Sequence, residues 1–380
     1  MKTKLLVITC ILSLFIAFTN SYDARETEEL SYAIAIGLDI SDSPDEPLAL
    51  TLQIAKPDSS DGSGTKITTE SKTVTCNSFS LGMAMLNLEN INEINLSHCT
   101  AIIISEELAK QGIEDFINTL ANDVEIRPTC NILISESKAS ELLEKASSIE
   151  DISAKFYNSF INSAKITSYV TTCPLTDFYS SLHGDIKAPT AIYTFTKGDT
   201  IESIGLAVFK DYKMVGKLSG LDTFCFNILT NEFQEATIEV YNPEDPDIPL
   251  SISLSNSKDK TKTKVTLENG IPKITCEISL KSSILSANEN YDYSSENAKR
   301  EVEAEINKFI KDSCTDFLNR TSKEYQSDII GFQGQFNKNY LTQDELDKHN
   351  WNELYPKAEF EIKPTNYLIT GFLFSKDWDY

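Results

Sequence analysis

The chain has 380 residues, and its 57 acidic and 34 basic side chains give a formal net charge of −23 at pH 7. This negative charge repels phosphate groups and anionic lipid surfaces, so it argues against nucleic-acid binding and against electrostatic docking on lipid. A hydrophobic fraction of 41% is enough for packed cores, and the length allows two or three globular domains.

The first residues have the pattern of an export signal. Lys2 and Lys4 precede an apolar run at residues 5–18, which gives way at once to a polar, acidic stretch. A cationic start followed by a short apolar run is typical of a signal sequence, whereas a spanning helix needs about 20 apolar residues. We therefore predict a signal or anchor segment at residues 1–21. A buried N-terminal helix, which is the alternative, does not account for the charged start.

Residues 22–189 are predicted to alternate strands and helices. Apolar residues at every second position of 48–54 have the period of a half-buried strand, and Ser105 and Gly112 are suited to begin and end a helix. We predict an N-terminal α+β domain at 22–75 and a middle α/β domain at 76–189. The predicted strands are 32–40, 48–54, 100–104 and 131–134, and the predicted helices are one starting at Ser78 and those at 105–112, 112–122 and 152–164.

The rest of the chain is predicted to hold a hairpin and helix region at 190–243 and a C-terminal α+β domain at 250–380. The hairpin turns at Asp211, and its region could complete the N-terminal domain. A polar, proline-containing break at 244–249 separates the two. The last domain is predicted to contain strands at 251–254, 262–267, 274–280, 359–362 and 367–374 and a helix at 295–325.

These elements predict a multidomain α+β fold. We expect mixed sheets packed with helices, and a C-terminal domain in which an antiparallel sheet is combined with one long helix.

The sequence contains no pattern that predicts catalysis or the binding of a metal or cofactor. The eight cysteines are widely spaced, and most lie in apolar settings, as Cys130 and Cys276 do, so we expect small buried side chains rather than zinc ligands. Only three histidines are present, and nucleotide-binding loops, serine-hydrolase elbows and zinc-protease motifs are missing. We therefore predict a protein that is not an enzyme and has no cofactor.

Motifs along the chain match one family pattern in their order and spacing. Tyr22 and Asp23 begin a segment similar to Trp-Asp-x-Arg-Glu with an acidic turn, and Gly37 and Asp39 follow as Gly-x-Asp in an apolar strand. Through these motifs the chain resembles the Ger(x)C family, the C subunit of bacterial spore nutrient-germinant receptors. The matching segments are 22–30, 35–39, 99–112, 125–127, 205–210 with 215–216, 325–332 and 351–356.

The resemblance implies a three-domain protein on the outer face of the inner spore membrane of Gram-positive bacteria. It implies no catalytic step, and it implies partnership with a multispanning A subunit and a transporter-like B subunit that together respond to nutrients. The family-motif positions are expected to be partner contacts or structural residues, with Asp328 and Gly331 fixing a turn and Trp351 lying in the core. These positions are Asp23, Arg25, Glu26, Glu29, Gly37, Asp39, Asp328, Gly331 and Trp351.

The chain departs from the family at the lipidation point. Where the family has its lipidated cysteine, this chain has Ser21. A hydroxyl cannot form the thioether that carries the lipid, so the sequence predicts no lipidation site. Anchoring must then come from an uncleaved apolar segment or from the partner subunits.

Two other functions stay open from the residues alone. An exported solute-binding protein would have a cleft between two similar lobes, and the long helix near the end of the chain argues against it. A secreted hydrolase acting on spore cortex or cell wall would hold two carboxylates in a deep pocket.

Overall fold

The computed structural model describes residues 30–58, 66–149, 157, 162–163, 167–184, 186–203, 205–242, 249–257, 260–286, 293 and 295–369. The predicted export segment and the positions Ser21, Asp23, Arg25, Glu26 and Glu29 lie outside the described residues. So do most of the break at 244–249 and of the predicted helix at 152–164. Within the described ranges, no helix is both long and apolar enough to cross a membrane.

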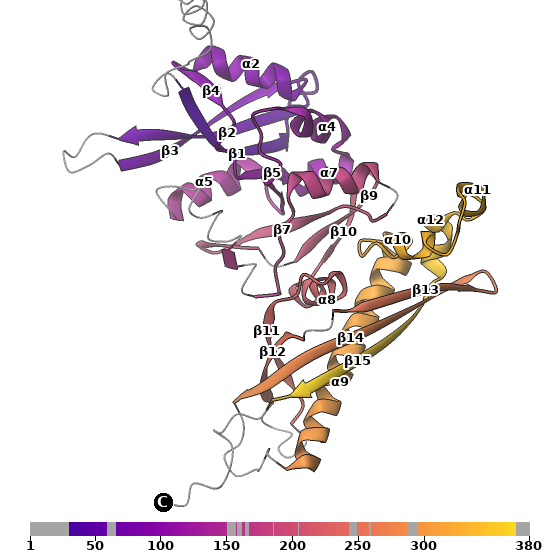
Figure 1. Cartoon of the computed structure of the whole chain (residues 1–380). Helices are drawn as coiled ribbons and strands as arrows, with labels where there is room; N and C mark the ends of the chain where they lie inside the picture. The colour runs from indigo at the N-terminus through magenta and orange to yellow at the C-terminus, as the bar shows by residue number, and fades with distance from the viewer. Residues whose placement is uncertain are drawn as a thin grey trace, which may run out of the picture.

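The N-terminal half of the chain forms one mixed sheet, drawn from indigo to pink in Figure 1. Its strands are β1 (Leu30–Ile40), β2 (Leu48–Asp58), β3 (Lys66–Cys76), β4 (Glu93–Asn95), β5 (Ala101–Ser105), β6 (Asn131–Ser135), β7 (Thr190–Lys197), β8 (Thr200–Glu202), β9 (Leu206–Lys210) and β10 (Lys213–Leu218). In the described part of the chain, the order is β10-β9-β7-β6-β5-β1-β2-β3, with β4 beside β1 and β8 beside β7. Strands β1, β5, β6 and β7 are parallel, and antiparallel strands continue the sheet on both sides.

Helices cover both faces of this sheet (Figure 1). The helices are α2 (Phe79–Glu89), α3 (Glu106–Gln111), α4 (Glu114–Asn122), α5 (Ala139–Ile149) and α7 (Leu175–His183). Buried side chains of α2, α3, α4 and α7 pack on one face, and those of α5 pack on the other. Strands β5 and β6 are buried at every residue, which is the continuous apolar pattern of parallel strands covered on both faces.

Strand β1 and helix α5 meet at the Gly-x-Asp positions. A Cβ added to Gly37 would lie 2.7 Å from Leu143 Cδ1, so the missing side chain lets α5 approach the strand closely. Asp39 is 2% exposed, and its Oδ1 and Oδ2 accept hydrogen bonds from the N–H groups of Ala139 and Ser140 at 2.6 and 2.9 Å. These N–H groups belong to the first turn of α5, where no intrahelical acceptor is available. Asp39 therefore caps a helix that begins 100 residues further along the chain.

The C-terminal half forms a second sheet beside one long helix, in the lower part of Figure 1. Its elements are β11 (Glu235–Val240), β12 (Leu250–Asn256), β13 (Lys262–Glu268), β14 (Ile271–Ser286), α9 (Glu296–Asn319) and β15 (Glu359–Leu368). Strand β14 is central, because β13 and β12 pair antiparallel with its first and second halves while β15 pairs with it in parallel. A parallel neighbour requires a crossover connection, and α9 lies within that connection.

These elements confirm the predicted α+β fold class, and they add that the last strand is parallel. The hairpin around Asp211, which has φ 54°, is confirmed as β9 and β10. Strands β11 and β12, on either side of the break at 244–249, pair with each other. The division of the chain into separately folding domains stays a prediction.

Two separate closing strands are predicted, at 359–362 and 367–374. This prediction is wrong for residues 363–366, which also belong to a strand. Strand β15 runs without interruption through Pro364 to Leu368, and residues 370–374 of the second predicted strand lie outside the described residues. Among the described strands, β15 pairs only with β14, and an edge strand tolerates proline because its missing N–H can face away from the neighbour. The predicted helix at 295–325 is confirmed as α9, followed by the π-helix η2 (Arg320–Glu324).

Replacing Asp39 with alanine is expected to lower the free energy of unfolding by about 1–2 kcal/mol, because the first turn of α5 loses its buried acceptor. Urea unfolding of the purified chain measures the change. Asp42→Ala is the matched control, since this side chain is 99% exposed and lies 3.9 Å from Lys138. It should change the stability by less than about 0.5 kcal/mol. Equal effects of the two substitutions would contradict the capping role of Asp39.

Candidate functional site at the junction of the two sheets

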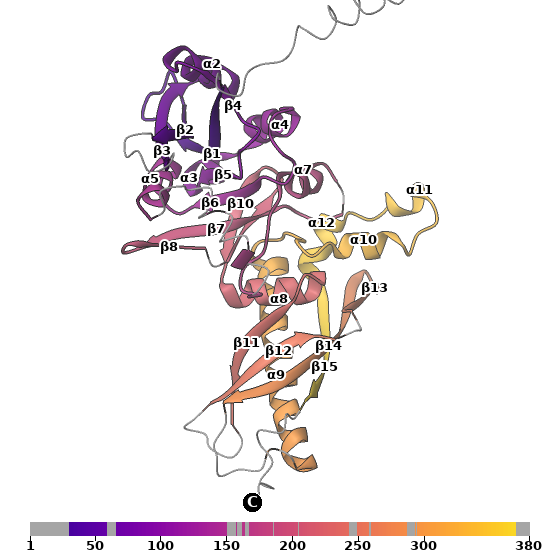
Figure 2. The same cartoon turned by 60° about the vertical axis from the view of Figure 1, so that its left-hand side comes forward.

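The two sheets are joined through one continuous apolar core. Leu143 in α5 and Val208 in β9 belong to the same buried cluster as Phe224 in α8 (Gly220–Thr230) and Ile310 in α9. Figure 2 shows α8 between the two sheets. Because apolar surface is buried on both sides of α8, the two halves are packed against each other rather than merely tethered.

An ion pair holds helix α8 to the long C-terminal helix. Ser219 and Asp222 form a capping box at the start of α8, in which Asp222 Oδ2 accepts a hydrogen bond from the Ser219 N–H at 2.8 Å. Asp222 Oδ1 accepts a hydrogen bond from the guanidinium of Arg320 in η2. The Asp222 side chain is only 6% exposed, so its negative charge is largely removed from water. The hydrogen bonds from Ser219 and Arg320 stabilise this buried charge.

Next to η2, Tyr325 packs against strand β10. A Cβ added to Gly216 would lie 2.2 Å from Tyr325 Cε1, so the ring occupies the space that a side chain would fill. The Tyr325 hydroxyl donates a hydrogen bond to the Lys217 carbonyl at 3.0 Å. Burial raises the pKa of this hydroxyl, which keeps it protonated and able to donate.

The segment after Tyr325 is bonded directly to the first half of the chain. Ser327 Oγ donates to the Phe209 carbonyl in β9 at 2.7 Å, and the Ala188 N–H donates to the Asp328 carbonyl at 2.8 Å. These bonds join residues more than 100 positions apart, so the turn that follows is fixed relative to the first sheet.

Asp328 places a buried carboxyl group in this turn. Its Oδ1 accepts a hydrogen bond from the Gly331 N–H at 2.9 Å, and its Oδ2 accepts from the Gln333 N–H at 2.8 Å and from Trp351 Nε1 at 3.0 Å. Gly331 has φ +87°, a conformation that strains residues with a side chain. Burial raises the pKa of the Asp328 carboxyl to about 6, against the opposing effect of the N–H donors.

Trp351 connects this turn to a buried aromatic cluster. The tryptophan is 4% exposed, and its ring centroid lies 4.9 Å from that of Phe336 and 5.9 Å from that of Tyr355. The Tyr355 hydroxyl lies 2.9 Å from Thr321 Oγ1 in η2. The large apolar area of the indole is thus buried while its N–H finds an acceptor in Asp328.

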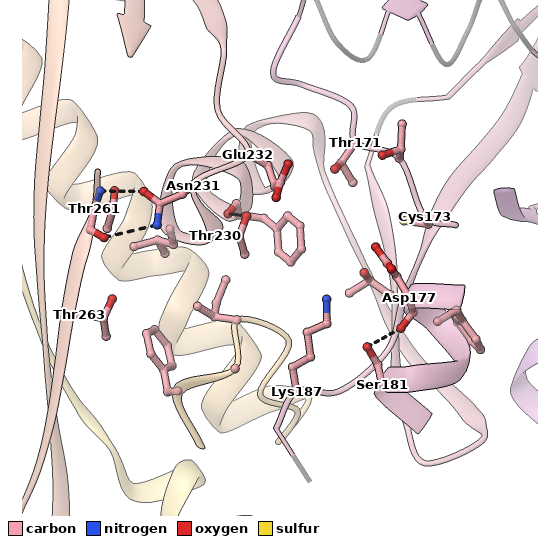
Figure 3. Close-up of a pocket in the computed structure, with 18 of the residues that line it drawn as sticks. Thr171, Cys173, Asp177, Ser181, Lys187, Thr230, Asn231, Glu232, Thr261 and Thr263 are labelled. Carbon is pink, nitrogen blue, oxygen red and sulfur yellow. Dashed lines mark hydrogen bonds between the residues drawn. The ribbon is translucent and has the colours of Figure 1, made fainter. Parts of the chain in front are cut away.

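A polar cavity of about 400 Å³ opens at the junction (Figure 3). Lys187 points its amino group into the cavity, and Asp177 and Glu232 line it from α7 and from the end of α8. Asn231, in the left-handed conformation with φ 66°, accepts a hydrogen bond from the Thr261 N–H at 2.8 Å and donates one to the Thr261 carbonyl at 3.3 Å. The turn at Gly331 forms another part of the wall.

The side chains of this cavity can hold polar groups but are poorly suited to catalysis. Burial raises the pKa of the Cys173 thiol to about 12, so the reactive thiolate is not formed near neutral pH. Asp177 and Glu232 are both exposed, whereas the general acid of a glycosidase lies in a desolvated setting. Among the residues that the structure describes, no three His, Cys, Asp or Glu side chains are placed to share a metal ion.

The cysteines behave as expected from the sequence. All seven in the described ranges are buried and none is in a disulfide. Cys99 Sγ and Cys130 Sγ lie 3.6 Å apart just before the starts of β5 and β6, and their proximity and burial raise the pKa of the Cys130 thiol. These thiols therefore contribute packing as small apolar side chains.

The structure brings only some of the family-motif positions together. Asp328, Gly331 and Trp351 form one hydrogen-bonded unit at the junction, whereas Gly37 and Asp39 lie at α5. Whether any of the nine family-motif positions contacts a partner stays a prediction.

Sequence reasoning missed the Asp222–Arg320 pair and the cavity. The Ser-x-x-Asp pattern at 219–222 could have indicated the helix start, but no pattern indicates the distant arginine.

The pH dependence of stability should report on Asp328. Its carboxyl has a raised pKa in the folded chain, near 6, against about 3.9 in an unfolded one, so the folded state binds the proton more tightly. Its contribution to stability is therefore full below about pH 4 and is lost as the pH rises through about 6, by about 3 kcal/mol in total. Urea unfolding between pH 4 and 7 should show this loss in the wild type and not in Asp328→Asn. Parallel pH profiles for the two proteins would contradict the assignment.

A methyl group at Gly216 should disturb the junction. Gly216→Ala is expected to lower the free energy of unfolding by about 2 kcal/mol, because the new Cβ overlaps the Tyr325 ring. Adding Tyr325→Ala removes the overlapping ring, so the double variant should lose less stability than the sum of the two single variants. Strict additivity in urea unfolding would show that the two residues do not interact.

Family models match both halves of the chain. The model described as "Spore germination protein N-terminal domain" matches residues 23–194, and the one described as "Spore germination B3/ GerAC like, C-terminal" matches residues 204–370. Together these matches include the junction and both sheets, apart from β8 and the end of β7.

Individual relatives agree with these matches. "Spore germination protein KC" of Bacillus subtilis (strain 168) is 22% identical, with 97% of this chain and 96% of that protein covered. "Spore germination protein GerQC" of Bacillus cereus is 23% identical, with 74% of this chain and 76% of that protein covered. The crystal structure of the GerBC protein has a TM-score of 0.57 at 16% identity, covering 91% of this chain and all of that one, which supports the fold. The chain therefore belongs to the Ger(x)C family, the C subunits of spore nutrient-germinant receptors.

Proposed function

We propose that this chain is a non-catalytic subunit of a membrane-associated germinant receptor, needed for the nutrient response that triggers germination. The observation that carries the proposal is the pair of spore germination family matches, which cover 23–194 and 204–370 in one chain. A role in spore germination follows from family membership. The non-catalytic nature and the place at the membrane go further and are inferred from the site and the sequence.

The geometry of the junction supports a role in assembly rather than in chemistry. The one carboxyl group of the site with a strongly raised pKa, Asp328, accepts hydrogen bonds from Gly331, Gln333 and Trp351. Its lone pairs are therefore used within the protein and are not directed at a substrate. The cavity carboxylates Asp177 and Glu232 are exposed, which argues against the hydrolase alternative.

The shapes of the two halves argue against a solute-binding protein. A binding protein of that type has two similar lobes around one cleft. Here a mixed parallel sheet covered by helices on both faces is joined to a sheet with a single long helix. The continuous core across α8 also disfavours lobes that open and close around a ligand.

The proposed partners are a multispanning A subunit and a transporter-like B subunit, on the outer face of the inner spore membrane. Since Ser21 stands at the family's lipidation point, the chain is held there by its apolar segment at 5–18 or by the partner subunits. Fractionation of spores, with mass analysis of the N-terminus of the mature protein, distinguishes these two modes of anchoring.

A deletion strain tests the proposed function. In a strain that keeps this receptor as its only one of the family, loss of the gene should abolish dipicolinic acid release in response to at least one nutrient, while vegetative growth stays unchanged. A wild-type copy should restore the response. Unchanged germination with every nutrient tested would overturn the proposal.

A further inference from the structure

One helix of the first sheet exposes apolar side chains where a surface helix normally carries charges. Helix α2 has the sequence FSLGMAMLNLE, in which Glu89 is the only charged residue. Leu81 and Leu88 are 46% and 87% exposed, and Ile91, just after the helix, is 101% exposed. Met85, half-buried against the core, lies on the same helix face as the exposed Leu81 and Leu88, since the three are spaced i, i+4 and i+7. We call Leu81, Met85, Leu88 and Ile91 the apolar ridge.

The packing of α2 fixes which face points outward. Phe79, Gly82 and Leu86 are buried against the sheet. A Cβ added to Gly82 would lie 2.8 Å from both Cys76 Sγ and Leu50 Cδ2, so the helix rests directly on β2 and β3 at this glycine. Rotating α2 to bury the ridge would break this contact. A surface helix normally exposes mainly polar and charged side chains, so a row of large exposed apolar side chains calls for a cover from outside the described residues.

The ridge lies where the chain enters the first sheet. Leu30, at the start of β1, pairs with Glu93 in β4, two residues after Ile91. Figure 1 shows α2 and β4 at the end of the molecule opposite β15. From Phe18, the last residue of the predicted apolar segment, an extended chain reaches Leu30 over at most about 40 Å. A membrane that holds the apolar segment is therefore within reach of the ridge.

The charges near the ridge favour a protein over a lipid surface as the cover. Glu89 is exposed at the end of α2, and the nearby amino group of Lys72 is already engaged, since it donates a hydrogen bond to Asn90 Oδ1 at 2.9 Å. Helices that bind lipid surfaces carry Lys and Arg on their polar face, whereas α2 has none and belongs to a chain of net charge −23. Protein interfaces instead have an apolar centre from which charged side chains are depleted.

We propose that the apolar ridge is the docking surface for a membrane-embedded protein whose facing surface is apolar and bordered by basic side chains. This inference rests on the proposed function, in which multispanning receptor subunits are the partners. According to this inference, the α2 end of the molecule faces the membrane, and the β15 end faces away from it.

Co-purification with the multispanning subunits tests the inference. The full chain is expressed together with the A and B subunits of its receptor, solubilised in mild detergent and recovered through an affinity tag. The double variant Leu88→Glu with Ile91→Glu should recover at least tenfold less of these subunits than the wild type, because two carboxylates would be buried without a partner. Leu341→Glu is the matched control: Leu341 is 96% exposed but lies in the C-terminal half, so recovery should be unchanged. Equal melting temperatures of the three proteins would show that all are folded.

A vesicle experiment separates the protein partner from the bilayer. The purified chain is mixed with vesicles of phosphatidylglycerol and phosphatidylethanolamine and floated on a density gradient. The wild type and the double variant should float to the same extent, because both contain the apolar segment at 5–18 and the ridge adds no affinity for lipid. Flotation of the wild type that is lost in the double variant would identify lipid as the cover and overturn the inference.

The outcomes also separate this inference from the proposed function. Full recovery of the A and B subunits by the double variant would overturn the ridge as the docking surface while leaving the receptor role intact. Failure of the wild type itself to recover them, together with normal germination of the deletion strain, would count against both.

Discussion

The junction between the two sheets depends on the buried carboxyl group of Asp328. Its side chain accepts hydrogen bonds from Gly331, Gln333 and Trp351, while its carbonyl accepts one from Ala188. A buried acceptor of this kind is tolerated only while its donors stay in place. The turn at Gly331, the indole of Trp351 and the chain that leads into β7 are therefore fixed together. The cavity in Figure 3 takes part of its wall from the same turn.

The family-motif residues within the described chain act mainly by positioning other elements. Gly37 leaves room for α5 and Asp39 caps it, and Asp328 with Gly331 forms a turn that receives the Trp351 N–H. None of these side chains is arranged to meet a substrate. Their effect is to join segments that are distant in sequence. In the proposal made above, the contact surface for the membrane-embedded partner is the exposed side of α2.

The sequence predicted those parts of the fold that local patterns determine. The alternating residues of β2, the apolar runs of β5 and β6 and the Asp211 turn were all found where expected, because strand periodicity and turn residues act over a few positions. The prediction missed the stretch of β15 that contains Pro364, and a proline there is tolerated because β15 lies at an edge. The Asp222–Arg320 pair and the fit of Tyr325 over Gly216 could not be predicted, because each joins residues about 100 positions apart. The cavity is likewise a product of the junction, and its lining residues share no motif.

The position of β15 has a consequence for how the chain acquires its structure. Strand β14 has β12 and β13 along one edge, and among the described strands its other edge is covered only by β15, residues 359–368. Synthesis proceeds from the N-terminus, so the first sheet can form before β15, which pairs with the open edge of β14, has been synthesised. An uncovered strand edge of this length, with its unpaired N–H and C=O groups, is prone to pairing with other chains. Completion of the second half is therefore a late event, and a chain cut short before residue 359 would leave β14 open to aggregation even if the first sheet were correctly folded.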